Sequence, residues 1–260
     1  MIVRKGRNFI SQLIHVCLNL LLAAGAVLLP VLTSSPILGL LLILVSKWRV
    51  FFVRTRYLFV NLKANLVDFI IGFSVVVLSF KLGSDLVVMH YVLLAVYALW
   101  LLVVKPLNSD FWVNFQGWVA VFLGTTATVI ASADSSLEAL SLAALFVIGY
   151  GASRHILCQK NDLGDMGIYS LIVGLMFAEI GWISFSWSIV YTIEAIGLAV
   201  PQLAIVLTIL AAVMERCRSV AVLNDGRLDF KQVAVPIVFG AVTILALAIW
   251  FSEPNFNLTV

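Results

Sequence analysis

The amino-acid sequence predicts an all-α protein, a polytopic transmembrane bundle of about nine helices. Hydrophobic residues make up 63% of the 260 positions, and charged residues make up only 11%. Apolar runs fill nearly the whole chain, and most are close to the roughly 20 residues that a helix needs to cross a bilayer. Because lipid offers the backbone no hydrogen-bond partners, these runs are expected to be helices rather than strands.

Nine apolar runs are expected to cross the membrane in order. They cover 9–33, 37–45, 65–80, 86–104, 111–131, 137–157, 166–184, 187–214 and 233–251. The longest polar connections between them have fewer than twenty residues, too few for a nucleotide-binding or hydrolase fold. The sequence therefore predicts one integral membrane domain, 1–260, with no soluble domain.

The basic residues predict the orientation. With the N-terminus inside, 15 of the 16 Lys and Arg residues fall on the inner side, and only Lys81 falls outside. This is the distribution that the positive-inside rule describes. We expect a multi-pass protein of the cell (plasma) membrane with its C-terminus outside.

Two parts of this predicted topology leave alternatives open. The run 37–45 would form a helix of only about 15 Å. That helix could begin near Val31 with a kink at Pro36, or continue past Lys47 with its basic groups snorkelling to the headgroups. A re-entrant hairpin is disfavoured because it would leave the most basic loop outside. The first run also resembles a signal peptide, although its apolar stretch continues through Val31, which favours an uncleaved anchor.

Two acidic residues fall inside predicted spans. Glu179 lies late in the run 166–184 and Glu194 lies early in the run 187–214, so a short turn would bring both to a similar depth, roughly 8–10 Å below the outer boundary. Like charges disfavour joint ionisation, so at least one acid would hold a proton. Intramembrane acids are often functional. The pair is a candidate proton or cation site, although two acids that only bond neighbouring helices fit the pattern equally well.

Further polar groups are expected in the same outer half of the bundle. Small and polar residues recur at steps of three and four along the run 187–214, from Glu194 through Pro201 to Ala211. Such a seam suits close helix packing, and Pro201 would free a carbonyl group there. The candidate proton, cation or solute site comprises Glu179, Glu194, Tyr191, Gln202, His90, Thr125 and Thr128.

Basic and aromatic residues alternate after the second run. This composition suits an interfacial helix on anionic lipid headgroups at the cytoplasmic face, with Asp68 following as a partner for the basic groups. Recognition of a phosphorylated lipid headgroup is the more specific alternative, but orientation and anchoring already explain the pattern. The residues expected to contact lipid are Lys47, Arg49, Arg54, Arg56 and Lys63.

Three stretches of this region carry a resemblance. The segments 32–36, 46–49 and 64–68, which read LTSSP, SKWR and ANLVD, resemble uncharacterised membrane proteins of small-genome bacteria of the Saccharibacteria type. The similarity covers about a quarter of the chain and implies no activity.

Two functional classes remain after the motif search. No phosphate-binding loop, nucleophile elbow or zinc-protease motif occurs, and no metal site, cofactor or nucleic-acid partner is expected. The first class is a proton- or cation-linked carrier or permease for a small solute. The alternative is a non-catalytic membrane scaffold or envelope-assembly subunit. A lipid-modifying enzyme ranks third, because its chemistry would have to sit in short interfacial loops.

Overall fold

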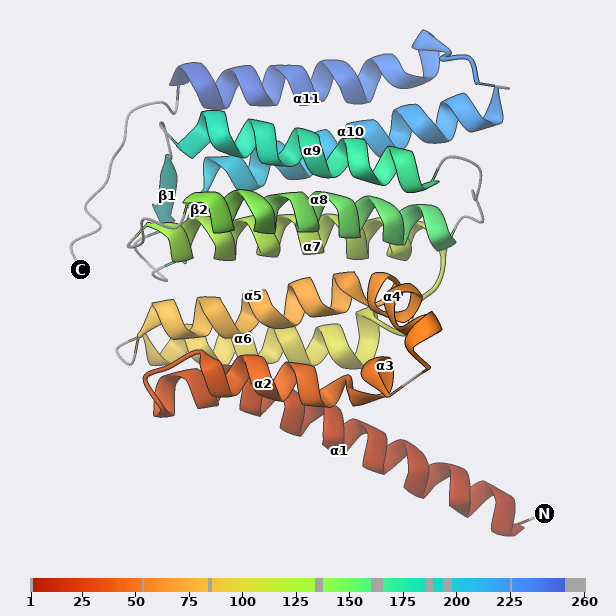
Figure 1. Ribbon diagram of the computed structural model, residues 1–260, viewed down its shortest axis with the longest axis vertical. Helices are drawn as coiled ribbons and strands as arrows, with labels where there is room; N and C mark the ends of the chain where they lie inside the picture. Colours follow the sequence, from red (N-terminus) through yellow and green to blue (C-terminus); the bar gives the residue numbers. More distant parts are fainter. Residues whose placement is uncertain are drawn as a thin grey trace.

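The computed structural model describes residues 2–52, 54–83, 86–133, 138–159, 166–185, 189–193, 198–224 and 226–250. In this part of the chain, eleven α-helices, one π-helical turn and one two-stranded hairpin form (Figure 1). Their bounds are α1 Ile2–Leu32, α2 Ile37–Ser46, α3 Trp48–Phe51, α4 Thr55–Ala64, α5 Leu66–Leu82, α6 Val87–Leu99, η1 Trp100–Val104, α7 Asp110–Ser132, α8 Glu138–Gln159, α9 Met166–Phe185, β1 Val190–Ile193, β2 Leu198–Pro201, α10 Gln202–Leu223 and α11 Phe230–Trp250.

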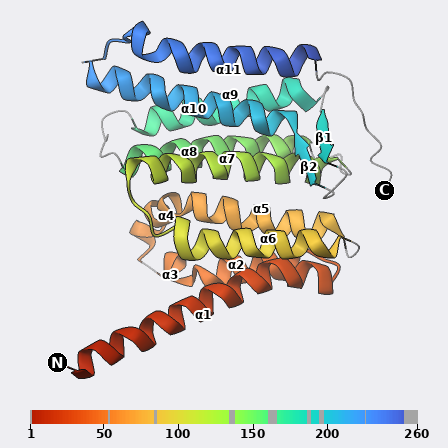
Figure 2. The same cartoon turned by 180° about the vertical axis from the view of Figure 1, so that it is seen from behind.

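The long helices lie side by side and run alternately in opposite directions, from α1 at one edge to α11 at the other (Figures 1 and 2). The packing of α5 against α7 joins the two halves of the bundle, and α10 packs on α7 as well as on α11. One end of the bundle, where α2, η1, α8 and α10 finish, carries Lys47, Lys105, Arg154 and Arg218. We call it the basic end. The hairpin lies at the opposite end.

Six of the described helices are long and apolar enough to cross a membrane. They are α1 from Ser11, α6 with η1, α7, α8, α9 and α11. The helices α4 and α5 meet at a bend of 60°, and they add a seventh candidate if the pair is one span. The helix α2 is shorter, and α10 carries Glu215, Arg216 and Arg218 near its end. The expectation of an all-α bundle of membrane helices is thus confirmed, with six or seven candidate spans in the described part of the chain where the sequence predicted about nine.

The expectation of one continuous helix over 187–214 is wrong for its first part. Residues 190–193 pair with 198–201 as an antiparallel hairpin, with Val190 opposite Pro201, and α10 begins only at Gln202. Three of the four β1 residues are β-branched and the fourth is Tyr191, a composition that favours strands. Pro201 has extended backbone angles, and its missing N–H is tolerated just before a helix. Of the expected seam, Pro201 ends β2 and the residues from Ala204 to Ala211 lie on α10, whereas Glu194 and Gly197 lie outside the described residues.

Glycine residues allow α8 and α9 to pack closely against each other. A Cβ atom built on Gly174 would lie 2.8 Å from the carbonyl oxygen of Phe146, and one on Gly149 would lie 2.8 Å from the Phe177 ring. Backbones approach this closely only where side chains are absent. The contact holds Phe177, which is almost fully buried, in a fixed position.

Replacement of Gly174 by alanine is therefore expected to destabilise the protein by about 1–3 kcal/mol, because the new methyl group meets a carbonyl oxygen that cannot move away alone. Gly167 on the same helix is the matched control, since nothing lies within 4 Å of a Cβ built there. Thermal melting of the detergent-solubilised variants would measure the difference. Equal melting of Gly174→Ala and Gly167→Ala would refute the close approach.

Candidate functional site

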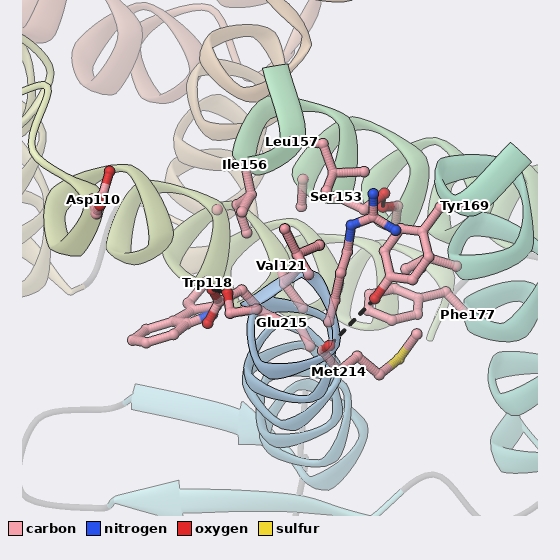
Figure 3. Close-up of a pocket in the computed structure, with 18 of the residues that line it drawn as sticks. Asp110, Trp118, Val121, Ser153, Ile156, Leu157, Tyr169, Phe177, Met214 and Glu215 are labelled. Carbon is pink, nitrogen blue, oxygen red and sulfur yellow. Dashed lines mark hydrogen bonds between the residues drawn. The ribbon is translucent and has the colours of Figure 1, made fainter. Parts of the chain in front are cut away.

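A cavity of about 470 Å³ lies between α7, α8, α9 and α10, toward the basic end (Figure 3). Its floor is apolar and buried, and it is formed by Val121, Ala152, Val173 and Phe177. At its other side, Val222 and Leu223 are more than half exposed, so the cavity is open there. The volume lies in the range of about 300–1,000 Å³ that is typical of pockets for small ligands.

Charged groups line the cavity from two helices. Asp110 comes from the first turn of α7, while Glu215 and Arg218 come from the second half of α10. Residues three apart share a helix face, so Glu215 and Arg218 both reach the cavity. The hydroxyl of Ser219 donates a hydrogen bond of 2.7 Å to the Glu215 carboxylate and holds it in place. The lining thus contains two acidic side chains and one basic side chain.

Aromatic side chains complete the walls. Figure 3 shows Trp118 on one side of α10 and Tyr169 with Phe177 on the other. The Arg218 guanidinium carbon lies 4.6 Å from the centroid of the Tyr169 ring, a cation–π contact, and the Tyr169 hydroxyl donates to the carbonyl oxygen of Met214 at 3.4 Å. The Nε1 atom of Trp118 is buried without a hydrogen-bond partner among the described atoms. A buried donor of this kind favours a ligand that offers an acceptor atom.

A polar cluster ties the neighbouring helices together at the basic end. The Asp68 carboxylate at the start of α5 pairs with Lys47, which follows α2, and with Lys105, which follows η1, at 2.7 Å for Lys105. The side chains of Asp68 and Lys47 are only 17% and 16% exposed. Burial lowers the pKa of Lys47, and the Asp68 charge opposes that shift. The expectation that Asp68 pairs with the preceding basic segment is confirmed for Lys47.

A second polar contact links α7 to α8 and η1 beside this cluster. The side-chain amide of Gln116 donates to the carbonyl oxygens of Val104 and Leu107, at 2.9 and 3.0 Å. Its amide oxygen lies 2.9 Å from the Nε2 atom of His155. Because a π-helical turn leaves carbonyl groups out of the regular ladder, Gln116 supplies one of their partners. Of the two contacts, the one between Gln116 and His155 joins α7 and α8, two of the helices that frame the cavity.

Of the two acids expected to form the site, only Glu179 lies among the described residues. Glu179 is exposed on the side of α9 that also carries Leu175, Trp182 and Ile183, and it does not line the cavity. Glu194 follows β1 and lies outside the described residues, so its pairing with Glu179 stays a prediction. Tyr191 lies on β1, and Gln202 is the first residue of α10, where its backbone N–H bonds to the carbonyl oxygen of Ile189.

The other expected site residues are positioned as packing groups. His90 is buried, and its two ring nitrogens lie 2.9 and 3.2 Å from the carbonyl oxygens of Leu86 and Ser79. The Thr128 hydroxyl bonds within its own helix to Gly124, while the Thr125 hydroxyl is fully buried with no partner in the described structure. None of these three residues lines the cavity.

The basic residues expected to contact lipid differ in exposure. Arg49, Arg54, Arg56 and Lys63 are exposed around α3 and α4, whereas Lys47 is held by Asp68. The Arg56 guanidinium also lies over the Tyr57 ring, at 5.4 Å from its centroid. These four exposed side chains can reach lipid headgroups at the basic end.

Comparison with known proteins supplies no further constraint: no protein-family model, curated protein or solved structure matches the chain. Over the described residues, no group of three or more His, Cys, Asp or Glu side chains is close enough to hold a metal ion.

The cavity itself was missed by sequence reasoning. Glu215 and Arg218 stand in a basic inner segment, where the positive-inside rule already accounts for the charges. The spacing of Glu215, Arg218 and Ser219, three and four residues apart, places all three on one face of a helix. That shared face, inside a 22-residue helix, was the signal in the sequence that could have identified them.

Proposed function

We propose that the protein is an integral membrane carrier that binds a small solute in the cavity between α7, α8, α9 and α10, with binding linked to a proton or another cation. The observation that carries this proposal is the cavity itself, an apolar chamber of about 470 Å³ with Asp110, Glu215 and Arg218 in its lining. Ionisable groups that face a cavity within a membrane bundle are typical of ion-coupled transport sites.

The proposal includes an orientation and a span count. The basic end faces the cytoplasm of a plasma-membrane protein, and α10 crosses the membrane although three charged residues lie near its end. With α2 and the bent pair α4–α5 also crossing, the bundle reaches the nine spans expected from the sequence. Arg49, Arg54 and Arg56 then lie at the inner surface, where each contributes about 1 kcal/mol of attraction to anionic lipid.

A flux assay tests the carrier function. The full chain is reconstituted into liposomes that contain a pH-sensitive dye, and small organic cations, amino acids and sugars are added outside. A proton-linked carrier is expected to change the internal pH for a subset of solutes. Ala211→Phe places a ring in the cavity and should abolish this change, whereas Ala95→Phe on the exposed side of α6 should preserve it. Solute-dependent flux that is equal in both variants would exclude the cavity as the route.

One observation on α11 favours a second candidate function, that of a non-catalytic membrane scaffold. This helix packs mainly on α10 and exposes a broad apolar face that includes Val235, Phe239, Val242 and Ile249. Lipid or a partner helix would cover such a face in a membrane. The scaffold would be favoured if the folded protein transported no solute and the cavity variants behaved like the wild type in the flux assay.

A further inference from the structure

We propose that the ligand of the cavity is an amphipathic organic cation, a molecule with an aromatic or aliphatic body and one fixed positive charge. This inference rests on the proposed function, because it concerns the same cavity. It follows from three properties of the lining: the balance of charge, the aromatic walls and the separation of apolar and charged parts.

The balance of charge favours a cation. Asp110 and Glu215 contribute two acidic groups to the lining, and Arg218 contributes one basic group, so the lining carries a net charge of −1 when all three are ionised. Unlike charges attract and like charges repel, so the acids of this partly open cavity favour a cation, and the half-buried Glu215 contributes more than the exposed Asp110. The Arg218 guanidinium already lies against the face of the Tyr169 ring, and this cation–π contact partly offsets the one positive charge of the lining.

The walls suit the body of such a ligand. Trp118, Tyr169 and Phe177 bring three aromatic rings to the cavity, and Val121, Ala152 and Val173 provide its buried floor. Aromatic rings attract organic cations and also pack against flat apolar groups. An acceptor oxygen on the ligand would in addition satisfy the buried Nε1 atom of Trp118.

The position of the charges sets the orientation of the ligand. Glu215 lies in the second half of α10 and Asp110 on the first turn of α7, so both acids lie toward the basic end. Phe177 and Val173 lie deeper along α9. The cationic group of the ligand would face that end, and its apolar body would extend toward the middle of the bundle. A strongly hydrophilic solute such as a sugar would offer no apolar group to pack against the floor.

Three probes of related shape and different charge test the proposal. Binding of tetraphenylphosphonium, neutral triphenylphosphine oxide and tetraphenylborate to the purified full-length protein in detergent is measured by equilibrium dialysis, with protein-free micelles as the blank. Tetraphenylphosphonium is expected to bind most tightly and tetraphenylborate least tightly. Glu215→Gln should weaken binding of the phosphonium by about fivefold, as expected for a partly exposed ion pair. It should leave the neutral probe unchanged.

Two variants test whether the probes bind in the cavity. Glu179→Gln removes an exposed acid that does not line the cavity and should leave all three affinities unchanged. Ala211→Phe should reduce the binding of every probe, because it removes space rather than charge. Both variants are first required to elute as folded protein in size-exclusion chromatography.

Each outcome separates the ligand class from the carrier function. Tighter binding of the borate, or equal binding of the phosphonium and the oxide with no effect of Glu215→Gln, would overturn the cationic ligand while leaving a ligand-binding cavity. Binding of all probes that Ala211→Phe does not reduce would overturn the cavity itself, and with it the proposed function. Charge-selective binding that both Glu215→Gln and Ala211→Phe weaken would support the inference.

Discussion

Replacement of Asp68 by asparagine is expected to destabilise the protein by about 3 kcal/mol, the lower end of the cost of breaking a buried ion pair. Asparagine keeps the size of the side chain but removes the charge that holds Lys47 and Lys105 beside each other. The two ammonium groups would then remain close together without an acid between them. For a chain of this length, the expected fall in melting temperature is about 6–12 °C.

Thermal melting of the detergent-solubilised protein would measure this effect. Glu179→Gln, which neutralises an exposed acid on α9, is the control and should melt with the wild type. The second change Lys47→Met, made in the Asp68→Asn background, should recover part of the loss because it removes one of the two like charges. If Asp68→Asn had the same melting temperature as the wild type, the ion pairs of the cluster would contribute little to stability, as surface pairs do.

Much of the bundle could be predicted from the sequence because lipid imposes a simple rule on it. The helices α7, α8 and α9 begin and end within about two residues of the expected runs 111–131, 137–157 and 166–184. A long apolar segment without charged residues has few other structures available in a membrane. The break between α4 and α5 was harder to predict, since Asn65 interrupts the helix without a proline or glycine residue.

The hairpin before α10 could not be predicted by the same rule. The stretch 190–201 is as apolar as a membrane helix, and hydrophobicity alone does not distinguish a short buried strand from a helix. Its β-branched residues and Pro201 were the relevant signals, but both also occur in membrane helices. Propensity is weaker than tertiary context, and here the strands pair with each other where β2 meets α7 and α10.

The candidate site was only partly predictable, because a cavity depends on which helices are neighbours. The sequence places Tyr169, Glu215 and Ser153 near the same end of three helices, but it does not state that those helices enclose one space. Glu179 was singled out by its depth in the span, and the structure adds that the face of α9 on which it lies is exposed and does not line the cavity. Its pairing with Glu194 stays a prediction.

The orientation of the bundle has the largest expected effect of all, since labelling at each position should be all or none. A variant without Cys17, Cys158 and Cys217 provides the background, and single cysteines replace the exposed Phe52 at the basic end or the exposed Ala133 at the opposite end. A membrane-impermeant maleimide added to intact cells is expected to label position 133 and not position 52. Permeabilised cells should show labelling at both.

The physical reason for this expectation is the charge asymmetry between the two ends. Moving the exposed Arg49, Arg54 and Arg56 across a bilayer during insertion is costly, whereas Lys81 is the single basic residue at the opposite end in the described part of the chain. A third single-cysteine variant, at the exposed Leu223 after α10, tests the span count, because α10 must cross for position 223 to share the side of position 52. Labelling of position 52 but not 133 in intact cells would invert the orientation. External labelling of 223 with protection of 52 would remove α10 from the set of spans, and the cavity would then open to the other side of the membrane.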